Sequence, residues 1–539
     1  MYRTHLALLI LTAILISESC QSPARTEQKS KRPNILFIMS DDHGYQAISA
    51  YSKRLIQTPN IDRIAQDGLL FTNACVTNSL CAPSRAVILT GKHSHLNGKI
   101  DNNFPFDTTN MTFPQLLQDA GYQTAMFGKL HFGNSPKGFD QFKILPGQGH
   151  YYNPDFITKK EGNITVEGYT TDIITDMTLD WLDQERDTTK PFMLMYLHKA
   201  PHREWLPPER HYKEFTKRTF PEPPTLFDDY SGRGNAAKEA EMNILENMNW
   251  AGDSKIYPEL MDELGIPQTM NWDKAAFEGE VGRQNAEQRA AWDAVYGPIN
   301  EDFKKRYPTM SREDLMHWRY QRYMQDYLGS IAAVDDGVGR VLDYLDAHGL
   351  TDNTIVIYTS DQGFFLGEHG WFDKRFIYNE SFKTPLLVRW PGVIKPGSVD
   401  TKMVQNLDFA PTFLEAAGIP IPMDMQGVSL LPLFRGDTAH FRDAVYYHYY
   451  EYPAIHMVKR HYGIVTEDYK LIHFYYDIDE WELYDRKNDT LELHNVFADP
   501  DYADVVKTMM AKLKDIREKY HDSDSLDQYY IKKYDELKK

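Results

Sequence analysis

Cys81 is the residue whose type and setting point most directly to chemistry. It opens the segment Cys81–Arg85, which reads CAPSR and is followed by Thr90 and Gly91. A cysteine is a candidate nucleophile. Pro83 is typical of a first helical turn, and the free N–H groups of a helix N-terminus favour an anion beside them. The plainer interpretation is a structural cysteine at the start of a helix.

Acidic and amide side chains follow two similar apolar runs. Asn34–Met39 (NILFIM) and Thr354–Thr359 (TIVIYT) are continuous apolar segments, which predict buried strands of a parallel sheet. The polar residues that follow them are Asp41, Asp42, Asp361 and Gln362. Because the carboxyl ends of parallel strands meet at one edge of a sheet, we expect these side chains to lie together. Such oxygens bind Ca²⁺ or Mg²⁺, and a carboxylate-rich cage with few waters favours Ca²⁺.

Basic and imidazole side chains stand in similar places. Tyr122–Phe127 and Phe192–Leu197 are two further predicted strands, and residues 370–381 (GWFDKRFIYNES) follow the second acidic cluster. Just after these strands, or within this segment, stand Lys129, His131, His198, His202, Lys374 and Arg375. Imidazoles suit proton transfer near neutral pH, and lysine or arginine neutralises charge on a reacting anion.

The elements that must position these groups alternate between strands and helices, which is typical of an α/β fold. Thr112–Gln115 has the arrangement of a capping box, and Gly121 is a helix stop. Residues 313–347 carry a long amphipathic helical pattern. Residues 204–312 are charged and predict a largely helical insertion, which either roofs the site or is a surface excursion without a role.

The pattern changes towards the C-terminus. Short alternating stretches at Tyr446–Tyr450, Tyr462–Thr466 and Leu471–Tyr476 predict a small antiparallel sheet, and Ala503–Tyr520 predicts a covering helix. We therefore expect a catalytic domain over residues 33–437 and a C-terminal α+β subdomain over residues 438–539.

The composition bounds the class of protein. Of the 539 residues, 42% are hydrophobic and 25% are charged, the balance of a soluble globular protein. The formal net charge of -18 argues against nucleic acid as a partner. It would also repel an anionic substrate at long range, so such a substrate needs a local basic pocket.

The N-terminus predicts export. Arg3 precedes the apolar run Leu6–Ile16, which has the length of a signal segment, and we expect residues 1–19 to be a signal peptide. Cys20 stands where a bacterial lipoprotein carries its lipid, which predicts membrane anchoring; simple cleavage is the alternative. Residues 20–32 are then a polar tether.

The other two cysteines do not make a disulfide framework. A bond between Cys75 and Cys81 is left open, but the apolar neighbours of Cys75 favour a buried structural thiol.

Taken together, the motifs resemble the formylglycine-dependent sulfatase family of the alkaline-phosphatase-like superfamily. Cys81–Arg85 is similar to its Cys-x-Pro-Ser-Arg signature, Lys129–His131 to its Lys-x-His, Ala200–His202 to its Ala-Pro-His, and Lys374 to the lysine before its Glu-Ser pair. Further counterparts extend the resemblance over nearly the whole chain after the signal: Thr58–Asp62, Asp408–Thr412, Gly427–Pro432 and Glu482–Asp485. The resemblance implies a large mixed, mostly parallel sheet between helices, with a small C-terminal antiparallel sheet plus helix.

The resemblance also implies a modified nucleophile. A formylglycine-generating or anaerobic sulfatase-maturating enzyme would oxidise Cys81 to formylglycine. One hydroxyl of the hydrated aldehyde attacks sulfur, and the other loses its proton as sulfate is eliminated, a second step that a serine or a thiol could not supply.

Roles for the remaining residues are implied by position. The metal ligands would be Asp41, Asp42, Cys81 as formylglycine, Asp361 and Gln362, where the family usually has Asn or His in place of Gln362. Arg85, Lys129 and Lys374 would hold the sulfate oxygens. His131 would take the proton in the elimination step, and His202, assisted by Lys374, would protonate the leaving alcohol. Asp361 is a second acceptor for the proton of the attacking hydroxyl.

Substrate specificity is implied at the level of the subfamily. Leu145–Asn153 (LPGQGHYYN), the spacer before Ala-Pro-His and the overall size look closest to N-acetylglucosamine-6-sulfatases. These features imply 6-O-sulfated N-acetylglucosamine of glycosaminoglycan or mucin glycans, hydrolysed in the periplasm or on the membrane of a Gram-negative bacterium. Candidate sugar contacts are His198, Arg203, His369, Arg375, Glu204, Trp205 and the loop Asp101–Asn103, with a structural role equally open for His198 and His369.

Three alternatives remain. The first is a sulfatase for another position, such as N-sulfoglucosamine, 2-O-sulfated uronate or N-acetylgalactosamine sulfate. The second is a phosphonate or phosphodiester hydrolase of the same superfamily. The third is a non-catalytic glycan-binding lipoprotein, which would not need the complete set of lysine, histidine and carboxylate groups.

Overall fold

The computed structural model describes residues 32–439 and 441–537, and residues 32–539 belong to one compact unit. The predicted signal peptide, the lipidation site at Cys20 and all but the last residue of the predicted tether lie outside the described residues. The boundary at residue 437 stays a prediction.

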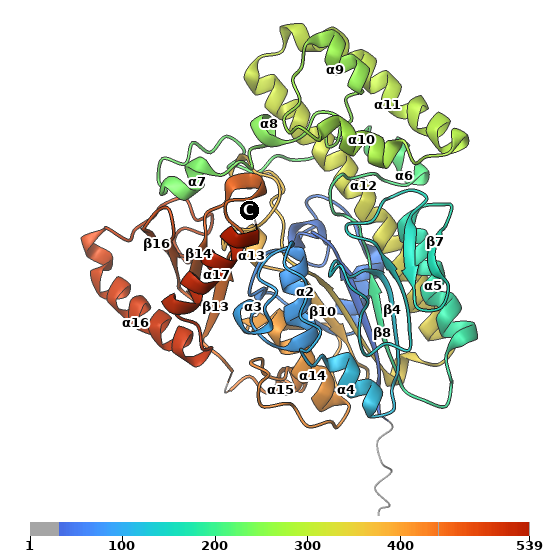
Figure 1. Cartoon of the computed structure of the whole chain (residues 1–539), viewed down its shortest axis with the longest axis vertical. Coiled ribbons are helices and arrows are strands. Elements are labelled where there is room, and N and C mark those ends of the chain that lie inside the picture. The colour runs from blue at the N-terminus through green and yellow to red at the C-terminus, as the bar shows by residue number, and fades with distance from the viewer. Residues whose placement is uncertain (1–31, 440, 538–539) are drawn as a thin grey trace, which may run out of the picture. The chain divides into compact units, whose positions relative to one another are not determined.

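A ten-stranded mixed sheet runs through this unit (Figure 1). Its order is β11-β2-β10-β9-β1-β8-β4-β5-β6-β7, and the five neighbouring strands from β9 to β5 are parallel. The strands are β1 (Asn34–Ser40), β2 (Leu69–Phe71), β4 (Gln123–Lys129), β5 (Gln141–Leu145), β6 (Asp155–Thr158), β7 (Gly162–Thr165), β8 (Phe192–Leu197), β9 (Thr354–Ser360), β10 (Leu386–Arg389) and β11 (Ser398–Asp400). The four strands predicted from the sequence are thereby confirmed as β1, β4, β8 and β9.

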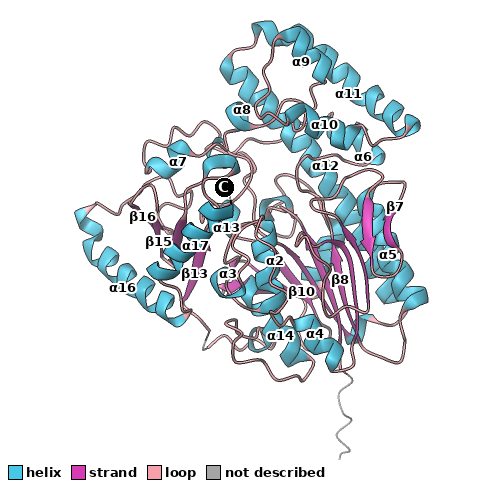
Figure 2. Cartoon of the chain, in the orientation of Figure 1, coloured by secondary structure: helices cyan, strands magenta, loops and turns pink. Residues whose placement is uncertain are grey.

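Helices cover both faces of the sheet (Figure 2). Side chains alternate between the two faces of a strand, so apolar side chains of one strand are buried under helices on either side. Leu36 and Ile38 of β1 pack into the core beneath α1 (Pro59–Gln66), α5 (Thr170–Asp180) and α12 (Arg312–Ala347). Ile35 and Phe37 pack into the opposite core beneath α2 (Cys81–Thr90), α4 (Phe113–Asp119) and α14 (Phe409–Ala416). Both predicted end signals of α4 are confirmed: the helix begins in a capping box at Thr112, and Gly121, with φ 89°, directly follows its C-cap Ala120. Helix α12 begins one residue before its expected start.

One glycine is needed where two of these strands approach closely. Gly128 of β4 has φ 108°, and a Cβ there would collide with the backbone oxygen of Leu197 in β8. Only glycine tolerates both conditions without strain. The close approach places Lys129, the next residue, beside the chain that leaves β8 towards His202.

The segment 204–312 consists mainly of helices and loops. Most of its helices lie near the N-terminal half of α12 at the top of Figure 1, whereas α7 lies apart at the left. The helices are α6 (Glu209–Phe215), α7 (Asn235–Glu239), α8 (Ile244–Asn247), α9 (Pro258–Leu264), α10 (Asp273–Val281) and α11 (Ala286–Arg306). Aromatic residues of α11, including Trp292 and Tyr296, are fully buried, so the segment shares the core on the α12 side of the sheet.

The C-terminal part is a four-stranded antiparallel sheet with helices, as expected. Its strands are β13 (Ala444–Tyr449), β14 (His461–Thr466), β15 (Tyr469–Phe474) and β16 (Glu480–Asp485), and its helices are α16 (Ala503–Lys519) and α17 (Asp524–Leu537). The strand β16 and the helix α17 were not expected from the sequence.

The remaining short elements complete the chain. They are a two-stranded sheet of β3 (Ala74–Cys75) and β12 (Val404–Gln405), and the helices α3 (Ser94–Asn97), α13 (Asn379–Phe382) and α15 (Leu431–Phe434). Cys75 is a buried thiol, as predicted, and burial raises its pKa to about 12. Within the described residues, every helix is too short or too polar to cross a membrane.

Candidate active site

Three carboxylates meet at the carboxyl ends of β1 and β9. Asp41, Asp42 and Asp361 each present an oxygen, and these oxygens all lie within 4.8 Å of one another. All three side chains are completely buried. The prediction that the two acidic clusters lie together is confirmed, because β1 and β9 are paired in parallel and end at the same level.

The donor set fits a divalent cation. Gln362 is fully buried beside the carboxylates, and its Oε1 has no hydrogen-bond partner among the described residues. Its Nε2 donates to Asp42. An orphaned buried amide oxygen is costly in an otherwise satisfied interior, and a metal ion would satisfy it. Three carboxylates and one amide oxygen are hard ligands of the kind that Ca²⁺ and Mg²⁺ prefer.

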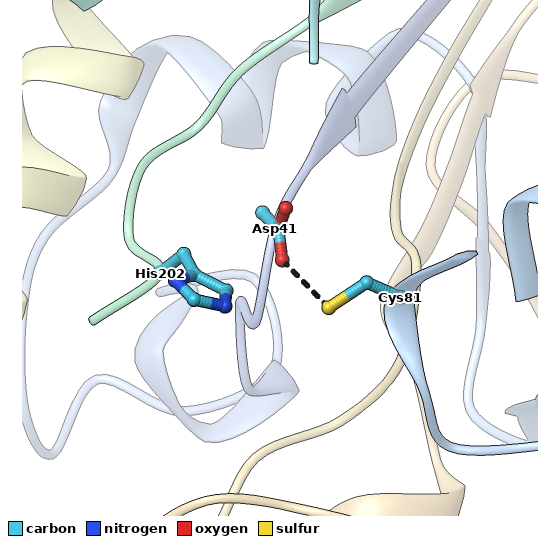
Figure 3. A group of neighbouring side chains, drawn as sticks. All are labelled: Asp41, Cys81 and His202. Carbon is cyan, nitrogen blue, oxygen red and sulfur yellow. Dashed lines mark hydrogen bonds between the residues drawn. The ribbon is translucent and has the colours of Figure 1, made fainter. Parts of the chain in front are cut away.

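Cys81 stands at the first position of α2 and points into this group (Figure 3). Its Sγ lies 3.4 Å from Asp41 Oδ1 and 3.8 Å from Gln362 Nε2. The sulfur stands where a formylglycine would carry its oxygen. Burial, followed by the charge of Asp41, raises the pKa of the Cys81 thiol well above its usual value. An unmodified thiol here would therefore stay protonated and be a poor nucleophile.

Three cations surround the carboxylates. Arg85 Nη2 lies 3.1 Å from Asp41 and 2.9 Å from Asp361, Lys374 Nζ lies 2.7 Å from Asp42, and Lys129 pairs with Asp41. Burial opposes ionisation of Asp41, but Lys129 and Arg85 together hold its pKa well below the usual value. Burial raises the pKa of Asp42 to about 7 despite Lys374. The cluster therefore sets three buried carboxylates against three buried cations.

Two imidazoles flank the same cluster. His202 Nε2 lies 3.7 Å from Asp42 Oδ2, and His202 lies beside Asp41 and Cys81 in Figure 3. His131 Nδ1 is buried and has no hydrogen-bond partner within the described chain. Burial, reinforced by the charge of Lys129, lowers the pKa of both imidazoles well below its usual value. This environment favours the neutral form of both rings.

The backbone at the site includes several non-glycine residues in the left-handed region. Asp42 has φ 64°, His131 φ 66°, Asp373 φ 77° and Arg375 φ 89°. Such conformations cost free energy and persist only where surrounding contacts enforce them. Their concentration at the ends of β1 and β4 and around Lys374 indicates a precisely held site.

A cavity of about 450 Å³ opens beside the charged cluster, with Lys374 and His202 in its lining. Helix α10 of the insertion forms one wall through Ala276 and Glu280, together with its N-cap residue Trp272. Of the two readings of the insertion, a role at the site is thereby supported. Most of the lining residues are polar or charged, so a cavity of this volume suits a polar ligand of sugar size.

The candidate sugar contacts divide into two groups. Arg203, Glu204 and Arg375 line the cavity. Of the predicted loop Asp101–Asn103, Asn102 also lines the cavity, whereas Asp101 and Asn103 do not. The side chains His198, Trp205 and His369 do not appear in its lining and are almost fully buried. His198 packs on Tyr196, Trp205 on Tyr323, and His369 Nδ1 lies 2.9 Å from Asp228.

Several residues of the lining were not singled out from the sequence. They are Lys199, Trp272, Ala275, Ala276, Gly279, Glu280, Asp373, Ile455 and His456. Asp373 and Lys199 adjoin recognised motifs, and adjacency was a usable signal. Trp272 and His456 come from the insertion and the C-terminal part, and no local pattern marks them.

Comparison with known proteins agrees with this geometry. The sulfatase family profile matches residues 33–419, and the profile of the N-sulphoglucosamine sulphohydrolase C-terminal region matches residues 367–519. The chain belongs to the sulfatase family, and it is a sulfuric ester hydrolase.

Individual relatives cover nearly the whole chain. An N-acetylglucosamine-6-O-sulfatase of Bacteroides thetaiotaomicron is 49% identical over 524 residues, covering 96% of this chain and 91% of the relative. A solved structure in complex with its substrate D-glucosamine-2-N,6-O-disulfate has a TM-score of 0.87 and 49% identity, covering 92% of this chain and 99% of that one. A phosphonate monoester hydrolase of Agrobacterium radiobacter, at 22% identity, has a TM-score of 0.65 over 91% of this chain and 96% of its own, and shares the fold.

Proposed function

We propose that this sulfatase removes the 6-O-sulfate from N-acetylglucosamine of glycosaminoglycan or mucin glycans. The observation that carries the proposal is the cavity of about 450 Å³, which joins the Lys374 and His202 end of the charged cluster to a wall of polar and aromatic side chains. The 49% identical relative named for this activity supports the choice of sugar. The similar structure that contains a 6-O-sulfated glucosamine supports it as well.

The group at position 81 is proposed to be formylglycine, made from Cys81 by a maturating enzyme. It would supply a hydrated aldehyde, with one hydroxyl to attack sulfur and a second to allow sulfate to leave. We also propose Ca²⁺, rather than Mg²⁺, as the ion held by Asp41, Asp42, Asp361, Gln362 and residue 81. A cation there would draw negative charge from the sulfate oxygens.

The surrounding residues then have separable tasks. Arg85, Lys129 and Lys374 bind the sulfate oxygens and stabilise the charge that grows on them. Neutral His131 accepts a proton when sulfate is expelled. Asp361 is a second acceptor beside the nucleophile.

His202 has the most demanding task, because it must be protonated to donate to the leaving alcohol. Burial and Lys129 lower its pKa, which opposes that state. An anionic sulfate ester beside the ring would raise the pKa again, since an opposite charge favours the protonated form. We therefore expect the His202 ring to become protonated when the substrate binds.

The test is sulfate release from defined sulfated sugars by protein produced together with a formylglycine-generating enzyme. The panel contains 6-O-sulfated N-acetylglucosamine, N-sulfoglucosamine, 6-O- and 4-O-sulfated N-acetylgalactosamine and a 2-O-sulfated uronate disaccharide. We expect release from the first sugar and none from Cys81→Ala protein. Sulfate release from another sugar alone would show that the proposed substrate is wrong. Substantial turnover by Cys81→Ala would refute the assignment of Cys81 as the nucleophile.

A phosphonate or phosphodiester activity is tested in the same experiment. Phosphate and phosphonate esters of the same alcohols are added to the panel, and kcat/KM values are compared. A higher value for the phosphorus esters, with formylglycine verified by mass, would move the activity to that class.

Export is proposed with the activity, in the periplasm or on the membrane of a Gram-negative bacterium through a lipidated Cys20. Metabolic labelling with palmitate, with Cys20→Ala as control, tests the anchor. Equal labelling of both proteins would contradict it.

A further inference from the structure

Asn102 connects the cavity with the helix that carries the nucleophile. It lies in the loop between α3 and α4, is half-buried, and lines the cavity together with His202, Lys374 and Arg375. Its Oδ1 accepts a hydrogen bond of 3.2 Å from the backbone N–H of Ala82, the residue after Cys81. The side chain therefore touches the first turn of α2 from the cavity side.

The orientation of the Asn102 amide follows from this contact. A backbone N–H can only donate, so the oxygen of the amide must face Ala82 and the nitrogen must turn away. The backbone N–H of Asn102 donates to Glu451 at 3.3 Å, and Lys99 donates to its carbonyl oxygen at 3.3 Å. The amide nitrogen donates to none of the described residues, so it is an unused donor on a residue that lines the cavity.

The chemistry of this donor separates it from the sulfate-binding groups. The charged end of the site holds Arg85, Lys129 and Lys374 around buried carboxylates, and such cations suit the sulfate oxygens. Asn102 is a neutral donor in the lining, and a neutral amide suits an uncharged oxygen acceptor. We propose that Asn102 is a specificity-determining residue whose Nδ2 donates a hydrogen bond to an oxygen of the substrate sugar outside its sulfate group. The proposal rests on the proposed carbohydrate sulfatase function.

The C-terminal helix α17 holds the loop that carries Asn102. Ile100 and Phe104 of this loop pack in one apolar cluster with Tyr450, Tyr530 and Tyr534. The hydroxyl of Tyr530 donates to the backbone oxygen of His95 at 2.8 Å. Helix α17 begins at Asp524, beyond residue 519, where the matched C-terminal family region ends. Tyr534 is accordingly a positioning residue that acts through the loop.

The decisive experiment compares Asn102→Ala with Asn103→Ala. Asn103 is the matched control, because it has the same side chain one residue later, is exposed, and is absent from the lining. Sulfate release is measured on 6-sulfated N-acetylglucosamine and on analogues that lack the oxygen at carbon 1, 3 or 4 or the acetyl group. If the wild type prefers another sugar of the panel, the analogues are made from that sugar.

We expect Asn102→Ala to lower kcat/KM on the parent sugar by roughly tenfold, mainly through KM, while Asn103→Ala stays near the wild type. On the one analogue that already lacks the contacted oxygen, Asn102→Ala should cost almost nothing more. Asn102→Asp keeps an acceptor for Ala82 but no donor, so it should show the same pattern. An equal loss on the parent and all analogues overturns the proposal, whereas a wild type inactive on every sugar refutes the proposed function instead.

The role of α17 is tested in the same format. Tyr534→Ala should raise KM. In the double variant with Asn102→Ala it should cause no further loss, because both changes remove the same contact between Asn102 and the sugar. Tyr529→Ala, on the same helix but 54% exposed, is the control. Tyr530→Phe removes only a hydroxyl and provides a milder variant if Tyr534→Ala does not fold. Losses that add fully in the double variant would overturn the positioning role.

Discussion

Asp41 and Asp361 leave adjacent parallel strands at the same level. Ser40 of β1 pairs with Ser360 of β9, so the next residue of each strand carries a carboxylate into the same space. Arg85 bridges the two, with its guanidinium 3.1 Å from Asp41 and 2.9 Å from Asp361. Two buried carboxylates this close repel each other, and a bound cation would relieve that repulsion.

Metal binding should therefore stabilise the folded protein. Adding Ca²⁺ to chelator-treated protein is expected to raise Tm, because the ion binds the native carboxylate cluster and not the unfolded chain. Gln362→Ala should weaken the calcium affinity by roughly 10- to 100-fold, since it removes one ligand oxygen. Titration calorimetry measures the affinity, with the exposed Gln66→Ala as control. Unchanged affinity in Gln362→Ala would remove this residue from the ligand set.

The link between the insertion and the cavity should be visible in Asp253 variants. Asp253 is fully buried, pairs with Arg203 and accepts a hydrogen bond from the backbone of Asn249 at 2.8 Å. Asp253→Ala would leave the Arg203 charge buried without its carboxylate partner, at a cost of about 3–5 kcal/mol in the free energy of unfolding. Because Arg203 lines the cavity, KM should rise as well.

Urea unfolding and sulfate-release kinetics measure the two effects of Asp253→Ala. Asp262→Ala is the control, because Asp262 pairs with Lys274 on the surface of the same insertion. A stable Asp253→Ala protein with unchanged KM would show that this ion pair does not hold the cavity wall.

Acid stability should depend on buried neutral histidines. Burial lowers the pKa of His198 to about 3, and neither ring nitrogen has a hydrogen-bond partner among the described residues. Between pH 6.5 and about 3 the unfolded state binds a proton that the folded state refuses, so stability falls as the pH falls through this window. The slope contributed by this one group approaches about 1.4 kcal/mol per pH unit.

His198→Phe should make the pH dependence of the free energy of unfolding shallower by that amount. Urea unfolding at pH 6.5 and pH 5 measures the slope, and His348→Phe, at an exposed position, is the control. An unchanged slope in His198→Phe would mean that this imidazole is protonated in the folded protein.

A buried ion pair ties the C-terminal sheet to the site-bearing segment. Lys470 Nζ lies 2.5 Å from Glu492 and also donates to the backbone oxygen of Ile377 at 2.7 Å, three residues after Lys374. Both side chains of the pair are at most 1% exposed. Lys470→Met should lower the free energy of unfolding by about 3–5 kcal/mol, because it leaves the buried Glu492 carboxylate without its cationic partner.

The matched control is Lys512→Met, which removes a surface pair with Asp443 and should cost about 0–1 kcal/mol. Chemical denaturation measures both. Replacing Lys470 and Glu492 together should recover much of the lost free energy of unfolding. A double variant as unstable as Lys470→Met would show that the unpaired Glu492 charge is not the cause of the loss.

Much of this protein could be read directly from its sequence. The strands β1, β8 and β9 are almost continuous apolar runs, as expected of strands that are buried on both faces. The strand β4 was predicted from its place after a helix stop. The polar residues after these runs had to meet at one edge, because parallel strands end together. The segment around Cys81 carried its own signature, and a helix start there agrees with the position of α2.

What the tertiary structure decided is the surface around that chemistry. Trp272 reaches the cavity from the insertion and His456 from the C-terminal part. The sequence pointed to the loop Asp101–Asn103, but only the structure shows that Asn102 is its cavity-lining residue and that α17 packs against the loop. His198 and His369, attractive in the sequence as motif neighbours, point into the core instead. Local periodicity records which face of an element is buried, but it carries no information on which distant loops pack against each other. The strand ends and the catalytic motif can therefore be predicted from local sequence. The cavity walls that contact the substrate form only when distant segments of the chain pack together.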